Sequence, residues 1–198
     1  MQASEDPMPN MAPPKKPLRE DATARLRRAV ERAGLDAPSL LVVTAAKYGA
    51  RWLDTATSDD GDVDPAALRL FEAIVEGAYL VAAADGDFDA AERAAFAEVM
   101  RAACGEKVSG ETLHAVVADL SDLLAEDGME KRVKMIARSI SEAEQAREVL
   151  RIATLIAQVS QGVSDVERRV LDCLAAELGL GGTAVDDAVR VVEQALSE

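Results

Sequence analysis

Hydrophobic residues recur at helical spacing along most of the chain. After Asp64 and Pro65, for example, apolar residues fall on one helical face at Leu68, Phe71 and Ile74, and this spacing continues down the chain. No segment alternates polar and apolar residues in the way that predicts a strand. Seven helices are predicted after residue 64, separated by turn residues: about 65–84, 90–104, 111–126, a fourth from 129, 141–159, 165–178 and 183 to near the C-terminus. The pattern therefore predicts an all-α protein.

The residues before this region predict a tail and two further helices. Residues 1–19 are rich in Pro and Met without periodicity, which predicts a disordered tail. A basic helix is expected over 21–35, and a second helix, strongly apolar in its first half, over 38–53. The domain prediction is thus a helical extension at 20–53, an acidic linker at 54–64 and a main helical domain at 65–198.

The amino-acid composition indicates which side chains fill the core. Hydrophobic residues make up 49% of the chain but aromatic residues only 3%, so small aliphatic side chains must fill the interior of closely packed helices. Cys104 and Cys173 lie in apolar helical context and are expected to be buried. The chain has neither a membrane-length apolar run nor the apolar stretch of a secretion signal, which predicts a cytoplasmic protein with no direct membrane span.

The net charge of −14 is concentrated in one part of the chain. Residues 54–128 contain 18 acidic and 4 basic residues, which equals the whole imbalance. Such a surface repels phosphate backbones and argues against nucleic-acid binding. It attracts cations or basic proteins, or it is simply a solvated acidic surface, and the sequence leaves these alternatives open.

An internal repeat has a constant offset of 75 residues. Leu80 falls on Leu155, and the pair Glu92-Arg93 falls on Glu167-Arg168. Each unit comprises a long apolar helix, a tight loop and an amphipathic helix that is opened by an acidic residue. Two units related by a pseudo-twofold axis would share one core.

The string Ala84-Asp85-Gly86, followed by Phe88 and Glu92, resembles the ADGxxxxxE motif of the TerB family, which is associated with tellurite resistance. The resemblance extends over about residues 65–196 in helix order and repeat spacing. It implies a seven-helix fold with one such motif in each half. It also implies a metal role for Asp85 and Glu92, extended to Glu167 if the two loops face each other.

The first loop places Asp85, Asp87, Asp89 and Glu92 within eight residues. Hard divalent cations prefer such carboxylate oxygens, and calcium is favoured, although the spacing is not that of an EF-hand. The second loop has Ser160 at the position of Asp85, so a cation site would centre on the first loop.

The same acidic residues have a purely structural interpretation. Capping boxes are predicted at three helix starts, namely Asp89 with Glu92, Ser164 with Glu167, and Ser141 with Glu144. Asp85-Gly86 is then the end of the preceding helix. A second acidic segment, at 59–64, is a weaker cation candidate because Asp64 before Pro65 is a typical helix start.

Catalytic chemistry is poorly represented. The chain has one histidine, His114, in a helical context that favours an exposed or half-buried position, and no glycine-rich phosphate loop. The leading hypothesis is a non-catalytic TerB-like stress-response or interaction module with a protein partner and a cation-binding loop. The alternatives are an adaptor that binds a basic partner through its acidic face without metal and, more weakly, a metal-dependent hydrolase. The oligomeric state is not specified by the sequence.

Overall fold

The computed structural model describes residues 28–30, 39–54, 64–86, 88–160 and 162–197. These residues form helices joined by short loops and contain no strand, which confirms the all-α prediction. After a short helical segment at 28–30, the helices are α2 (Leu40–Asp54), α3 (Pro65–Ala82), α4 (Ala90–Ala103), α5 (Gly110–Asp127), α6 (Met129–Ser139), α7 (Ala143–Ser160), α8 (Asp165–Glu177) and α9 (Ala184–Ser197). No helix in these ranges combines the length and the apolar character needed to cross a membrane.

Each of the seven predicted stretches after residue 64 contains one helix, because local signals set the helix ends. Asp64 caps α3 by accepting hydrogen bonds from the backbone N–H groups of Ala66 and Ala67, each at 3.1 Å, and Pro65 occupies the first turn. Gly128 separates α5 from α6 with φ of 76°, a left-handed conformation that favours glycine. The local sequence therefore determines the turn between α5 and α6.

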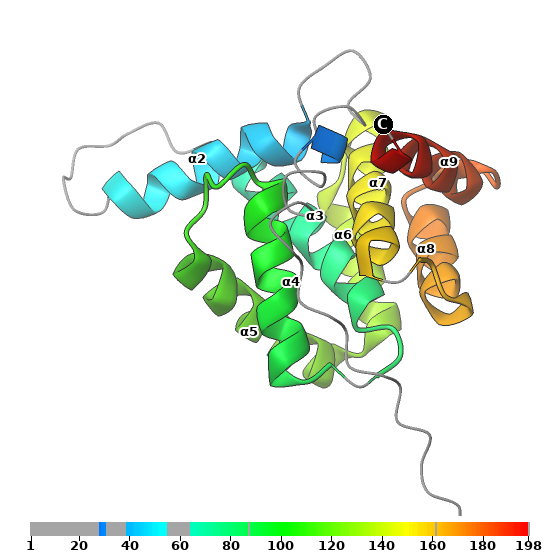
Figure 1. Ribbon diagram of the computed structural model, residues 1–198, viewed down its shortest axis with the longest axis horizontal. Helices are drawn as coiled ribbons and strands as arrows, with labels where there is room; N and C mark the ends of the chain where they lie inside the picture. The colour runs from blue at the N-terminus through cyan, green and yellow to red at the C-terminus, as the bar shows by residue number, and fades with distance from the viewer. Residues whose placement is uncertain (1–27, 31–38, 55–63, 87, 161, 198) are drawn as a thin grey trace, which may run out of the picture.

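Helix α3 is the centre of the fold. Of its 18 residues, 14 are buried, and its most extensive contact is with α7. The two helices approach closely because Gly77 lacks a side chain: a Cβ at this position would lie only 2.8 Å from Val149 Cγ1. Figure 1 shows α4 and α5 on one side of this pair and α8 and α9 on the other.

The predicted 75-residue repeat stays a prediction, although some helix starts have this spacing. Adding 75 to the start of α4 gives the start of α8, and adding 75 to the start of α5 gives a position one residue inside α9. The helix neighbours differ between the two halves, however, because α9 packs mainly along α7 whereas α5 packs mainly against α4. The pseudo-twofold axis itself stays a prediction.

The extension helix α2 packs on α3 and α7, and the Tyr48 and Phe71 rings lie 4.4 Å apart. The predicted tail at 1–19, most of the basic helix at 21–35 and the linker at 55–63 lie outside the described residues. Cys104 is buried, and this burial raises the pKa of its thiol to about 12. The prediction that Cys173 is buried is wrong, since its position on α8 faces solvent.

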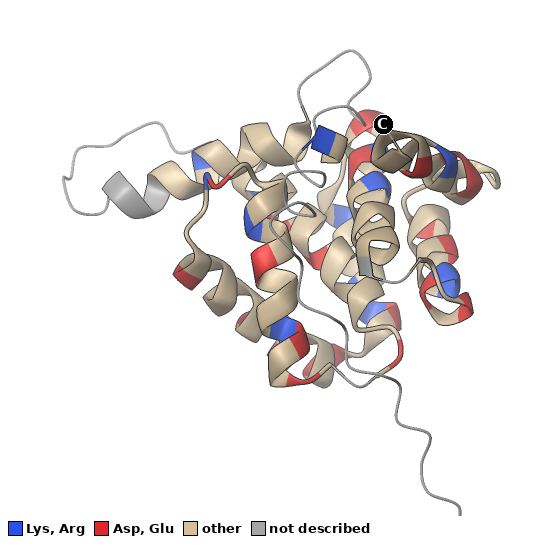
Figure 2. Cartoon of the chain, in the orientation of Figure 1, with Lys and Arg blue, Asp and Glu red and all other residues tan. Residues whose placement is uncertain are grey.

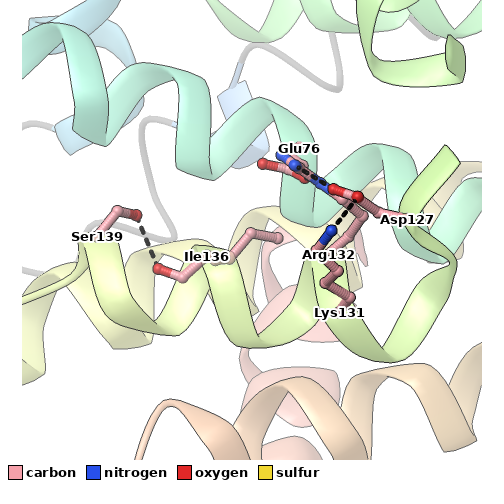
Figure 3. Close-up of polar contacts among 6 residues, drawn as sticks. All are labelled: Glu76, Asp127, Lys131, Arg132, Ile136 and Ser139. Atoms are coloured by element: carbon pink, nitrogen blue, oxygen red, sulfur yellow. Dashed lines mark hydrogen bonds and ion pairs between the residues drawn. The ribbon is translucent and has the colours of Figure 1, made fainter. Parts of the chain in front are cut away.

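A three-charge cluster ties α6 to α3 and to the end of α5 (Figure 3). The Arg132 guanidinium on α6 binds Glu76 of α3 at 2.6 Å and Asp127 of α5 at 3.0 Å. Hydrogen bonding to Glu76, more than to Asp127, raises the pKa of Arg132. Because Glu76 is a buried carboxylate on the central helix, this guanidinium supplies the partner that its burial requires.

Acid should weaken this cluster through Asp127. Hydrogen bonds from Lys131 and then from Arg132 hold the pKa of Asp127 below its ordinary value of 3.8. The stabilisation is therefore complete above that value and is lost as the pH falls through the lower pKa of the folded state. We expect Asp127→Asn to lower the melting temperature at neutral pH and to converge with the wild type in acid, once the pH falls below the lowered pKa of Asp127.

The measurement is the melting temperature against pH, with Glu126→Gln as the control. Glu126 is the exposed neighbour of Asp127 and makes no ion pair with any described residue, so its variant should follow the wild-type curve. Parallel curves for Asp127→Asn and the wild type would contradict the assigned role of the cluster.

Candidate functional site

The loop between α3 and α4 contains the predicted cation ligands. Helix α3 ends where the Ala83 N–H donates to the Tyr79 carbonyl at 2.9 Å, and the Gly86 N–H then donates to the Ala83 carbonyl at 3.1 Å. Gly86 has φ of 86°, so this glycine makes the turn, as the structural interpretation of Asp85-Gly86 predicts. Asp85 is exposed to solvent beside it. Asp87 lies outside the described residues.

Asp89 and Glu92 form the predicted capping box at the start of α4. The Glu92 N–H donates to Asp89 Oδ1 at 2.8 Å, and the Asp89 N–H donates to Glu92 Oε2 at 3.0 Å. Ser164 and Glu167 form the equivalent box at α8, with distances of 3.2 Å and 2.8 Å. Both predictions are confirmed, and one oxygen of each glutamate is used in its box.

The third predicted capping box is wrong. Helix α7 begins at Ala143, two residues after the predicted start, so Ser141 is not adjacent to its first turn. The Ser141 N–H donates to Gln145 Oε1 at 3.4 Å, and Glu144 pairs with Arg147 at 3.0 Å. The exposed Glu144–Arg147 pair takes the place of the expected reciprocal cap.

Aromatic packing holds the loop, a feature that sequence reasoning missed. Phe88 packs edge-on against Tyr79 and Phe96, with ring centroids 5.3 Å and 6.1 Å away. The Arg93 guanidinium donates to the Phe88 carbonyl at 2.5 Å. The sequence did contain a signal for this cluster. The chain has few aromatic residues, and three of them, Tyr79, Phe88 and Phe96, occur around this loop. Phe88, near the α4 end of the acidic loop, thus anchors the loop to both α3 and α4.

The two repeat-related loops do not form a shared site among the described residues. Figure 1 shows the start of α4 on the α5 side of the molecule and the start of α8 on the α9 side. Arg168 at the start of α8 pairs with Asp186 of α9 at 2.7 Å. Within the part of the chain that is described, no three His, Cys, Asp or Glu side chains gather in a way that would hold a metal ion. The shared site with Glu167 therefore stays a prediction.

The weaker candidate segment at 59–64 contributes one described residue. Asp64 caps α3 and also pairs with Lys47 of α2 at 2.6 Å, and hydrogen bonding to Lys47 is the main cause of its lowered pKa. Residues 59–62 lie outside the described ranges. Asp64 thus has the structural role that its position before Pro65 predicts.

The outer face of α5 carries a row of acidic residues that we call the acidic stripe. It consists of Glu111, Asp119, Asp122 and Glu126, all exposed and close together on one helical face. None of them forms an ion pair with another described residue, and α5 contains no Lys or Arg. Figure 2 shows acidic residues along α5 and near the start of α4. His114 is exposed on the same helix, as predicted.

Comparison with known proteins gives one match. A family model described as "Tellurite resistance protein TerB" matches residues 71–190. Neither the curated proteins nor the solved structures include a match. The matched region runs from the middle of α3 into α9 and contains both capping boxes and the acidic stripe, whereas α2 lies before it.

The two capping boxes should contribute measurably to stability. We expect Asp89→Ala and Ser164→Ala each to lower the free energy of unfolding by about 1 kcal/mol, because each leaves a helix N–H without its acceptor. Urea denaturation monitored by circular dichroism measures this change. Asp119→Ala, which alters an exposed residue in the middle of a helix, should stay within about 0.5 kcal/mol of the wild type. An equally small effect of Asp89→Ala would contradict the cap.

Proposed function

The chain belongs to the TerB family of tellurite resistance proteins, and on this basis we propose that it is a non-catalytic stress-response module that binds a basic protein partner through the acidic stripe. Family membership supports the module, and the unpaired charges of α5 support the kind of partner.

The observation that carries the proposal is the contrast between Asp127 and the stripe. Asp127 is neutralised within the chain by Lys131 and Arg132, whereas the four stripe residues have no basic partner among the described residues. Exposed charges of one sign on a helix repel each other, and a basic surface relieves this repulsion on binding. The exposed Ala115 and Ala118 on the same helix leave room for the partner to approach.

The environments of the reactive residue types support a non-catalytic role. Burial raises the pKa of Cys104 to about 12, which keeps it a thiol at neutral pH. His114 is exposed on the outer face of α5 rather than enclosed beside a nucleophile. The proposed location is the cytoplasm. There, a basic protein partner and dissolved salt cations would compete for the acidic stripe.

Neutralising the stripe tests the partner. We expect the triple variant Asp119→Asn, Asp122→Asn, Glu126→Gln to lose its bound basic protein, with affinity reduced about tenfold or more. The measurement is affinity purification from the native host with quantitative mass spectrometry, at low and high salt, because salt screens exposed charge pairs.

The matched control removes three exposed acidic residues elsewhere, by Glu142→Gln, Asp165→Asn and Glu177→Gln. This variant has the same net charge as the stripe variant and should retain the partner. If both variants lose the same proteins, the effect comes from net charge alone and the stripe is not the binding surface.

A second candidate activity is weak binding of a divalent cation, with calcium favoured, by the first loop. Asp89 Oδ2 and Glu92 Oε1 remain outside the capping box, and Asp85 is exposed in the same loop. Asp87 and, from the other half of the chain, Glu167 complete the proposed set. A bound ion would neutralise clustered carboxylates and would stabilise the folded state by mass action.

Thermal melts test the cation. Millimolar calcium should raise the melting temperature of the wild type relative to EDTA, and magnesium and manganese should raise it less. The double variant Asp85→Asn, Glu92→Gln should lose most of this shift, while Gln at position 92 keeps the capping box. No shift with any ion, or the same shift in the variant, would count against the site.

A further inference from the structure

Helix α2 lies outside the residues that match the family, yet it covers part of their core. It packs on α3 and α7, and Leu41, Ala45 and Tyr48 are buried in this contact region. Figure 1 shows α2 lying across the top of the view, from above α4 toward the top of α7. The Tyr48 ring covers Phe71, which lies at the first matched position and is fully buried.

The N-terminus of α2 is held by a carboxylate from α7. Glu148 is only 2% exposed, and its Oε1 accepts hydrogen bonds from Ser39 Oγ at 2.5 Å and from the Leu41 N–H at 3.1 Å. Arg151, one turn along α7, forms an ion pair with the same carboxylate. A helix N-terminus carries partial positive charge and free N–H groups, so Glu148 acts toward α2 as a cap supplied from another helix.

A second point of recognition lies near the other end of α2. A Cβ at Gly49 would lie 2.0 Å from the Lys107 carbonyl oxygen in the loop between α4 and α5. Because this neighbour is backbone, only glycine allows such an approach. The surface that receives α2 therefore has three separate requirements: a free helix N-terminus, an aromatic residue over Phe71, and a glycine against Lys107.

We propose that α2 is a helical ligand built into the chain. It docks in cis on a receptor surface formed by α3, α7 and the α4–α5 loop, and it can detach without unfolding the family domain. Detachment uncovers Phe71 and the Glu148 carboxylate. The surface exposed in this way accepts an amphipathic helix of the same type as α2. This device is independent of the acidic stripe, which lies on the outer face of α5.

Hydrogen exchange on the full-length protein tests whether α2 detaches alone. In the wild type, we expect α2 amides to exchange through a local opening that leaves α3 and α7 protected. Glu148→Gln removes the charge that binds the helix N-terminus and should speed α2 exchange about tenfold. Glu144→Gln, an exposed change on the same helix, should leave α2 exchange unchanged. If α2 exchanges together with α3 in the wild type and in Glu148→Gln, the proposal is wrong.

A synthetic peptide of residues 39–54 provides the second measurement. Gly49→Val in the full-length chain should displace α2, and the labelled peptide should then bind that variant and not the wild type, as measured by fluorescence anisotropy. Failure of the peptide to bind the Gly49→Val protein would overturn the receptor surface. A wild-type dimer that the peptide converts to monomers would show that α2 of a second copy occupies the surface, and would overturn docking in cis.

Discussion

The close contact between α3 and α7 is the constraint on which the rest of the structure depends. With few aromatic residues available, the core gains packing density by bringing helix backbones together rather than by filling space with large rings. Gly77 is the point at which this is achieved, since any side chain there would meet Val149. The other helices cover the two sides of this pair, so their positions follow from it.

Buried charge in this protein marks joints between helices that are distant in sequence. Glu76 joins α3 to α6 through Arg132, and Glu148 joins α7 to the start of α2. In each case a partner of opposite charge or a helix N-terminus compensates the desolvation of the carboxylate. These joints specify orientation, because an apolar contact tolerates sliding and a hydrogen-bonded carboxylate does not.

The acidic residues, which outnumber Lys and Arg by 36 to 22, play three different roles. Some cap helices, as Asp64 and Asp89 do, and their charge is used locally. Others are paired inside the fold, as Asp127 is with Arg132. The stripe on α5 belongs to neither group, since its residues form no ion pair with other described residues, and it is the surface that we propose for a basic partner.

The sequence by itself determined the helices, most of their ends and the family, because spacing, caps and turn glycines act within a few residues. The capping boxes of Asp89 with Glu92 and of Ser164 with Glu167 were predictable for that reason. The box predicted at Ser141 was wrong because α7 begins two residues later than predicted. Only the tertiary structure decided that Cys173 faces solvent and that Glu148 holds α2. Those outcomes depend on how whole helices pack, and the energy of that packing comes from contacts between residues far apart in the chain.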